Sequence, residues 1–174
     1  MVAQQAAVRL EDISRDAMAA DLTDGERRAW IEDALDCIRQ HGAVIVGKTT
    51  MTGFALSGVG INPHYGTPGN PYDRARVPGG SSAGAPVSVA DGQAVVAIGT
   101  DTGGSVRIPA ALCGVVGFKP TATRISRDGA VPLSTTLDSI GPLANSIACC
   151  AIADAVMAGE EPAAPEAVAV AGLR

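Results

Sequence analysis

Aromatic and basic residues are scarce in this chain. Phe, Trp and Tyr make up only 3% of its 174 residues, and 13 Lys and Arg stand against 18 Asp and Glu, for a net charge of −5. The basic residues are scattered, with no stripe in which they alternate with aromatic ones. A nucleic-acid surface needs such a stripe to neutralise phosphates and to stack on bases. We therefore expect no direct contact with nucleic acid.

Long hydrophobic runs are also missing. No apolar run approaches the ~20 residues that cross a bilayer, and residues 1–5 lack the basic and then apolar pattern of a secretory signal. The sequence therefore predicts a cytoplasmic protein that does not associate with a membrane. With 47% hydrophobic and 18% charged residues, the chain can bury one globular core.

Potential metal ligands of the Cys and His type are few. The sequence holds only Cys37, Cys113, Cys149, Cys150, His41 and His64. Their spacing matches no metal-binding pattern. We expect no metal and no organic cofactor, and we interpret the cysteines as reduced structural thiols.

Helix and strand patterns alternate along the first half of the chain. Residues 23–26 have the form of a capping box, and apolar positions recur at helical spacing up to Gly42, which is suited to end a helix. Residues 43–46 are a short apolar, β-branched run that predicts a buried parallel strand, and Lys48 lies just past its carboxyl end. Residues 57–80 are rich in Gly and Pro and predict a long ordered loop.

The alternation continues in the second half. The predicted elements are helices over residues 82–90 and 146–158 and strands over residues 94–99 and 115–118. Pro86 lies near the first turn of its helix, where a missing N–H does little harm. The last helix is apolar on most sides, which predicts a mostly buried position, and Gly159 ends it. This order of elements favours an α/β fold.

Two short motifs match known patterns but lack the required context. Residues 42–49 satisfy the P-loop pattern, yet a helix precedes Gly42 and an apolar run occupies the place of the phosphate-binding turn. Residues 80–84 match a nucleophile elbow centred on Ser82, but the segment before them is polar and ends in proline instead of forming a strand. Both histidines also precede every candidate serine, whereas that fold places its histidine last.

Two serines in glycine-rich turns follow Lys48. Ser81 lies within residues 78–84 and Ser105 within residues 99–107. A serine hydroxyl is a weak nucleophile that needs a base nearby, and the oxyanion formed after its attack needs backbone N–H donors, which glycines leave accessible. Composition alone nevertheless favours ordinary turn serines and a strand-end lysine.

The segments around these residues resemble the amidase signature family over about residues 42–159. The matching stretches are 47–51 (GKTTM), 79–84 (GGSSAG), 99–114 (GTDTGGSVRIPAALCG), 117–121 (GFKPT) and 137–144 (LDSIGPLA). So long a match favours the catalytic interpretation. It implies an α/β fold with a mixed, mostly parallel sheet and helices on both faces, truncated here because family members are usually more than twice as long.

The resemblance also implies an organisation of the chain into three parts. We expect a poorly ordered N-terminal segment over residues 1–22 and the amidase signature core over residues 23–159. A linker and the start of a truncated element would follow over residues 160–174.

The resemblance further implies a Ser, cis-Ser, Lys triad. Ser105 would be the nucleophile, Ser81 the proton relay and Lys48 the base, with a cis peptide bond between Gly80 and Ser81. The expected oxyanion donors are the backbone N–H groups of Thr102, Gly103, Gly104 and Ser105. The expected supporting residues are Gly80, Ser82, Asp101 and Arg107, of which Asp101 and Arg107 would brace the turn without reacting.

The implied activity is hydrolysis of a linear carboxamide to a carboxylate and ammonia or an amine through an acyl-serine intermediate. Two alternatives stay open: a catalytically inert fragment or interaction module, and the amidase component of a glutamine-dependent tRNA amidotransferase. The expected partners are a small-molecule amide substrate and either a second copy of the chain or amidotransferase subunits.

Overall fold

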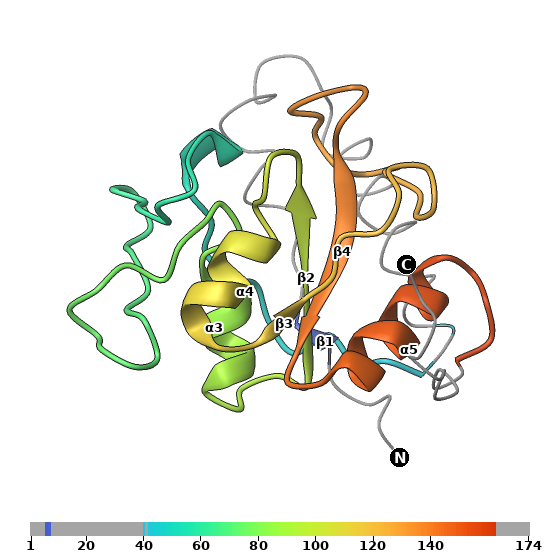
Figure 1. Cartoon of the computed structure of the whole chain (residues 1–174), viewed down its shortest axis with the longest axis horizontal. Coiled ribbons are helices and arrows are strands. Elements are labelled where there is room, and N and C mark those ends of the chain that lie inside the picture. Colours follow the sequence, from blue (N-terminus) through green and yellow to red (C-terminus); the bar gives the residue numbers. More distant parts are fainter. Residues whose placement is uncertain (1–5, 8–39, 41, 163–174) are drawn as a thin grey trace, which may run out of the picture.

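The computed structural model describes residues 6–7, 40 and 42–162. Its sheet has four strands in the spatial order β1-β2-β4-β3, and Figure 1 shows the two long strands, β2 and β4, side by side. The strands are β1 (Ala6–Ala7), β2 (Val96–Asp101), β3 (Val116–Gly117) and β4 (Ser139–Ala144). β2 is parallel to β1 and antiparallel to β4, and β4 is antiparallel to β3.

The expectation of a mostly parallel sheet is therefore not confirmed among the described strands. β4 begins at Ser139, opposite Asp101, the last residue of β2. The segment between Asp101 and Ser139 leaves the sheet and re-enters it at the same end. β4 therefore runs antiparallel to β2. Hydrogen bonding in this part of the sheet consequently follows the antiparallel pattern.

The burial of β2 explains why its sequence predicts a strand. Ala97, Gly99 and Asp101 are buried while the residues between them are partly exposed, which is the two-residue period of a strand with one covered face. The predicted strands over 94–99 and 115–118 are confirmed, with ends displaced by one or two residues. β4 escaped prediction because it contains Pro142, a residue that argues against an interior strand.

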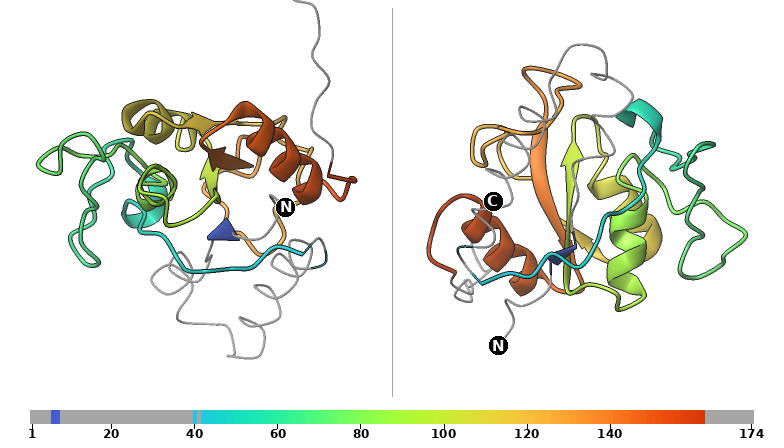
Figure 2. Two further views of the ribbon diagram at one scale, coloured as in Figure 1. Left: turned by 90° about the horizontal axis from the view of Figure 1, so that it is seen from below. Right: turned by 180° about the vertical axis from the view of Figure 1, so that it is seen from behind.

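Helices cover both faces of the sheet. α3 (Gly84–Ala90) and α4 (Arg107–Cys113) lie on one side and α5 (Ile147–Met157) on the other, as Figures 1 and 2 show from three directions. α3 and α5 confirm two predicted helices. α4 was not predicted, because its first residue, Arg107, was assigned to the glycine-rich turn over residues 99–107 and Pro109 lies within the helix.

α5 is less buried than its composition predicts. Ser146 caps its start by accepting a hydrogen bond from the Cys149 N–H at 3.1 Å, and Gly159 follows its end with a φ of 75°. Cys150, Asp154 and Val156 are buried, whereas Ile147 is 73% exposed. The expectation of a mostly buried helix is wrong, because only one side of α5 meets the sheet.

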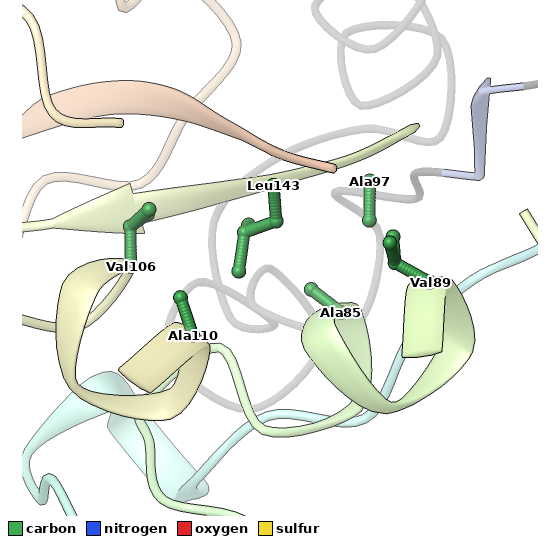
Figure 3. Packing of buried hydrophobic residues seen from close by; sticks show 6 residues of the cluster. All are labelled: Ala85, Val89, Ala97, Val106, Ala110 and Leu143. Carbon is green, nitrogen blue, oxygen red and sulfur yellow. The ribbon is translucent and has the colours of Figure 1, made fainter. Parts of the chain in front are cut away.

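The hydrophobic core lies between the sheet and the pair α3 and α4, as Figure 3 shows. Its buried members are Ala85, Val89, Ala97, Val106, Ala110 and Leu143. Ala97 and Leu143 are partners in the β2–β4 register and project toward the helices. Small alanine side chains on both layers allow the helices to approach the sheet closely.

The predicted strand over residues 43–46 is not found. Only Ile45 makes a β-bridge there, and Val44 and Val46 are 53% and 48% exposed. An apolar, β-branched run forms a buried strand only when neighbours pair with it on the sheet, and β1 to β4 do not extend to it. The loop over residues 57–80 is confirmed, with turns and a single bridge between Asn70 and Asp73.

Several expectations fall outside the described residues. They are nearly all of the helix before Gly42, the poorly ordered segment over 1–22 apart from β1, and most of the linker over 160–174, so the division into three parts stays a prediction. Gly42 itself has a φ of 79°, which suits the end of a helix. Within the described ranges, no helix is long and apolar enough to cross a bilayer. The cytoplasmic location stays a prediction.

Candidate active site

The two serine-bearing turns meet at the carboxyl end of β2. The backbone N–H of Ser82 donates to the carbonyl of Ser105 at 3.2 Å, and the Ser82 hydroxyl donates to the carbonyl of Thr100 at 3.4 Å. The peptide bond between Gly80 and Ser81 is cis, as the resemblance implies. The two turns are thus joined at the backbone, through the residue after the candidate relay Ser81 and through the candidate nucleophile Ser105.

The segment after Lys48 is attached to the first serine turn. The N–H of Thr52 donates to the carbonyl of Ser81 at 2.9 Å, and the N–H of Gly84 donates to the carbonyl of Thr50 at 2.7 Å. Lys48 is partly buried. These bonds place the segments that carry Lys48, Ser81 and Ser105 next to one another.

The Ser81 side chain is completely buried, and its hydroxyl has no hydrogen-bond partner among the described residues. The expected row of hydrogen bonds from Lys48 through Ser81 to Ser105 is therefore not closed in this structure. The roles of the three side chains stay a prediction.

Gly80 is needed here because other atoms approach its backbone. A Cβ at this position would lie 2.6 Å from the Thr52 hydroxyl oxygen and 2.8 Å from the Gly60 nitrogen. Real Cβ atoms do not make contacts this close, so the packing excludes any side chain. The absence of a side chain at Gly80 allows the residue 52 segment and the loop at Gly60 to close around Ser81.

The turn that carries Ser105 is folded around a buried carboxylate. Asp101 is fully buried at the end of β2, and its two oxygens accept hydrogen bonds from the N–H groups of Gly104, Val106 and Arg107 at 2.7–3.3 Å. The Arg107 guanidinium adds two more, at 3.0 and 2.9 Å. Burial alone would raise the pKa of Asp101, but the hydrogen bonds from Arg107 and the backbone outweigh it and hold the pKa below its ordinary value.

These contacts correct one expectation about the oxyanion donors. The Gly104 N–H points to Asp101 and is not available in this structure. Gly104 has a φ of 129°, a conformation that favours glycine and lets the chain turn back over the carboxylate. The N–H groups of Thr102, Gly103 and Ser105 have no acceptor among the described residues. The candidate oxyanion donors are therefore the N–H groups of these three residues.

A cavity of about 770 Å³ lies beside this turn. Thr52 and Thr102 line it, together with parts of the segments 50–56 and 122–140. Lys48, Ser81 and Ser105 do not line it. The cavity is thus adjacent to the candidate triad, because two residues of its lining, Thr52 and Thr102, lie close in sequence to Lys48 and Ser105.

Asp138 also lines the cavity and contacts Thr102. The sequence analysis did not single it out. Its Oδ1 accepts a short hydrogen bond from the Thr102 hydroxyl, and its Oδ2 accepts from the N–H groups of Leu133 and Ser134 at 2.8 and 2.9 Å. The signal that could have identified Asp138 is its position in the matching stretch over residues 137–144.

The fold and the paired serine turns agree with the amidase signature family. The amidase family model matches residues 33–172, and the chain belongs to this family. Members of the family hydrolyse C–N bonds of amides.

Similar proteins include the A subunit of the glutamyl-tRNA(Gln) amidotransferase from Nitratidesulfovibrio vulgaris. It is 48% identical over 128 residues, which cover 74% of this chain and 26% of that protein. The crystal structure of the corresponding protein from Thermotoga maritima, which bears the same name, is 42% identical with a TM-score of 0.69, covering 71% of this chain and 27% of that one. The peptide amidase from Stenotrophomonas maltophilia is 42% identical with a TM-score of 0.70, covering 74% and 27%.

The chain spans about a quarter of the length of these relatives. The identity and the TM-scores establish the amidase fold for the matched part.

Proposed function

We propose that this chain carries the catalytic core of an amidase that hydrolyses a linear carboxamide to a carboxylate and ammonia or an amine. The observation that carries the proposal is the junction of the two serine turns, where the Ser82 N–H donates to the Ser105 carbonyl. In a chain of the amidase family this junction supports a serine relay, because it holds the two serine turns together.

In the proposed reaction the Ser105 oxygen attacks the carbonyl carbon of the amide. Its proton passes to Ser81, and the Ser81 proton passes to the side-chain nitrogen of Lys48. The C–N bond then breaks, and the proton returns through Ser81 to the leaving nitrogen. Water adds to the acyl-Ser105 ester by the same route, which releases the carboxylic acid and restores the Ser105 hydroxyl.

The negative charge that develops on the substrate oxygen would be stabilised by backbone donors. The N–H groups of Thr102, Gly103 and Ser105 are the candidates, since the Gly104 N–H donates to Asp101. Loss of one donor of this kind slows acyl transfer by about 10²–10³-fold. Asp101 and Arg107 support the proposal by fixing the end of the turn that follows these donors.

The Ser81 hydroxyl sets a condition on the proposal. Buried hydroxyls in folded proteins nearly always have a hydrogen-bond partner, and leaving one without a partner costs about 1–3 kcal/mol. Because the fully buried Ser81 hydroxyl has no partner among the described residues, the proposed relay requires it to form hydrogen bonds with Lys48 and Ser105 when the substrate is bound.

A second candidate function rests on one observation. The Nitratidesulfovibrio relative, named as a component of an amidotransferase, is 48% identical to the matched part of this chain. On this alternative the ammonia released at Ser105 would be used by partner subunits instead of being discharged as a product. Copurification of the tagged chain with proteins that handle glutamyl-tRNA would favour it, and a second copy of this chain as the sole partner would not.

A third alternative is a fragment without activity, because the chain covers only 26% of that relative. In that case the serine turns would be folded, but Ser105 would not be activated as a nucleophile.

A fluorophosphonate probe tests the proposal. Its phosphorus is attacked by an activated serine oxygen with loss of fluoride, and mass spectrometry of the peptide identifies the serine. We expect labelling at Ser105 that is abolished in Ser105→Ala and strongly reduced in Lys48→Ala and Ser81→Ala. Lys119→Ala is the matched control, since Lys119 is the only other lysine in the sequence and its ammonium donates to the Pro120 carbonyl.

Each result decides between the alternatives. Labelling that survives Lys48→Ala but fails in Lys119→Ala would contradict the assigned base. A folded wild-type chain without labelling would contradict the amidase proposal and favour the inert fragment.

A further inference from the structure

Asp138 is a buried carboxylate in the cavity wall that the proposed reaction does not use. It is 8% exposed and lies at the residue before β4. Its Oδ2 accepts two backbone N–H groups, from Leu133 and Ser134, which fix the orientation of the carboxylate. Its Oδ1 accepts the hydroxyl of Thr102 in a short hydrogen bond.

The β2–β4 register explains why these two side chains meet. Asp101 and Ser139 are partners in the ladder, so Thr102 and Asp138 are the next residues on either side beyond the end of the paired strands. Thr102 is also the first of the three candidate oxyanion donors. The turn from Thr102 to Arg107 is therefore held at its far end by Asp101 and at its near end by Asp138.

We infer that Asp138 is a positioning residue, which holds Thr102 so that the donors of residues 102–105 keep the orientation that the oxyanion requires. This inference rests on the proposed function. Backbone donors stabilise an oxyanion only when they are fixed before the charge develops. A turn with glycines at positions 103 and 104 has little stiffness of its own, so it depends on anchors at both ends.

Asp138 contacts two parts of the chain, the Thr102 hydroxyl and the backbone at residues 133–134. If Asp138 acts on the turn through the Thr102 hydroxyl, removal of that hydroxyl must reproduce the loss of Asp138. If Asp138 only holds the backbone at residues 133–134, removal of the Thr102 hydroxyl must have no effect. Thr102→Val tests this, because valine has nearly the shape of threonine without the hydroxyl, while Thr102→Ser retains the donor.

The experiment compares full-length Asp138→Ala, Thr102→Val, Thr102→Ser and the Asp138→Ala/Thr102→Val double variant. Two quantities are measured: the second-order rate constant for fluorophosphonate labelling of Ser105, and the ¹⁵N order parameters of the Thr102, Gly103 and Gly104 amides. Asp73→Ala is the matched control, since Asp73 also caps a turn, accepting from the Ala75 N–H at 3.0 Å, but does not line the cavity.

We expect labelling to fall about 10- to 100-fold in Asp138→Ala and in Thr102→Val, with order parameters of the turn falling from about 0.85 toward about 0.6. Thr102→Ser should recover part of the labelling lost in Thr102→Val, because it retains the hydroxyl, and Asp73→Ala should stay within about threefold of wild type. The double variant should be no worse than either single variant, because both remove the same contact.

The outcome separates this inference from the proposed function. If the wild-type chain is not labelled, the amidase proposal fails, and the order parameters alone decide whether Asp138 holds the turn. Wild-type values for both labelling and order parameters in a folded Thr102→Val variant would overturn the inference, whatever Asp138→Ala does. Wild-type order parameters in both Thr102→Val and Asp138→Ala would also overturn it.

Discussion

At the scale of single residues, the Asp101 carboxylate determines the shape of the turn that carries Ser105. It is fully buried and accepts hydrogen bonds from three backbone N–H groups and from the Arg107 side chain, which is itself about half exposed. A buried carboxylate is tolerated only when such partners replace water. Because these partners all follow Asp101 within six residues, one side chain organises the whole turn.

Asp101 should make the stability of the protein depend on pH. Since folding lowers its pKa, the unfolded chain binds the proton more tightly than the folded chain. The contribution of the carboxylate is therefore complete above its unfolded pKa of about 4 and is lost as the pH falls through the lower folded value. We expect Asp101→Asn to reduce the free energy of unfolding by about 2–4 kcal/mol at pH 7.

Urea denaturation at pH 7 and at about pH 3 measures this effect. The difference between wild type and Asp101→Asn should shrink at the lower pH. Asp73→Asn is the control, because Asp73 pairs with Arg76 at an exposed site, where such pairs contribute no more than about 1 kcal/mol. A difference for Asp101→Asn that is equal at both pH values would contradict the assignment.

At the scale of elements, Arg124 attaches the loop after β3 to the end of α5. Its Nε donates to Asp154 at 2.6 Å, and its two terminal nitrogens donate to the carboxylate oxygens of Glu160 at 2.9 and 2.8 Å. The Asp154 side chain is 9% exposed and that of Glu160 is 54% exposed. The bond to Asp154 is consequently the more important one, since water screens the pair with Glu160.

Replacement of Arg124 should loosen α5 from the rest of the fold. Arg124→Ala leaves the buried Asp154 carboxylate unpaired, and we expect a loss of about 1–3 kcal/mol in the free energy of unfolding. Arg124→Lys should recover only part of it, because an ammonium cannot form the forked contacts of a guanidinium. Urea denaturation measures both. Arg76→Ala, at an exposed pair, is the control, and an equal loss in that variant would contradict the special role of Arg124.

At the scale of the whole molecule, two buried thiols report on the integrity of both layers. Cys113 in α4 and Cys150 in α5 lie on opposite faces of the sheet, and burial raises the pKa of each thiol to about 11. Their sulfurs contact the carbonyls of Pro78 and Val116 at 3.4 and 3.5 Å. The interpretation of the cysteines as structural thiols agrees with this burial for these two.

Iodoacetamide should therefore discriminate between the cysteines. At pH 8 we expect the folded protein to be modified at Cys149, which is partly exposed, and not at Cys113 or Cys150. In urea Cys113 and Cys150 should react as well, because unfolding removes the burial that raises the pKa of these two thiols. Peptide mass spectrometry over a time course measures this, and modification of Cys113 at the rate of Cys149 in the folded state would contradict it.

Local patterns were sufficient for several elements. The caps of α5 at Ser146 and Gly159 act within one turn of the helix, and the alternation in β2 acts within six residues. For such features the interacting groups are close in sequence, so the residues alone predict them. The glycine-rich turns at Ser81 and Ser105 belong to the same class.

Contacts between distant segments decided the rest. The antiparallel pairing of β4 with β2, the exposure of Val44 and Val46 and the hydrogen bond from Thr102 to Asp138 all join or separate residues far apart in the chain. No local pattern carries a strand register or the identity of a neighbour, because these depend on which surfaces the folded chain brings together. The sequence alone thus determined the family and the candidate serines, whereas only the tertiary structure joined the two serine turns and tied Thr102 to Asp138.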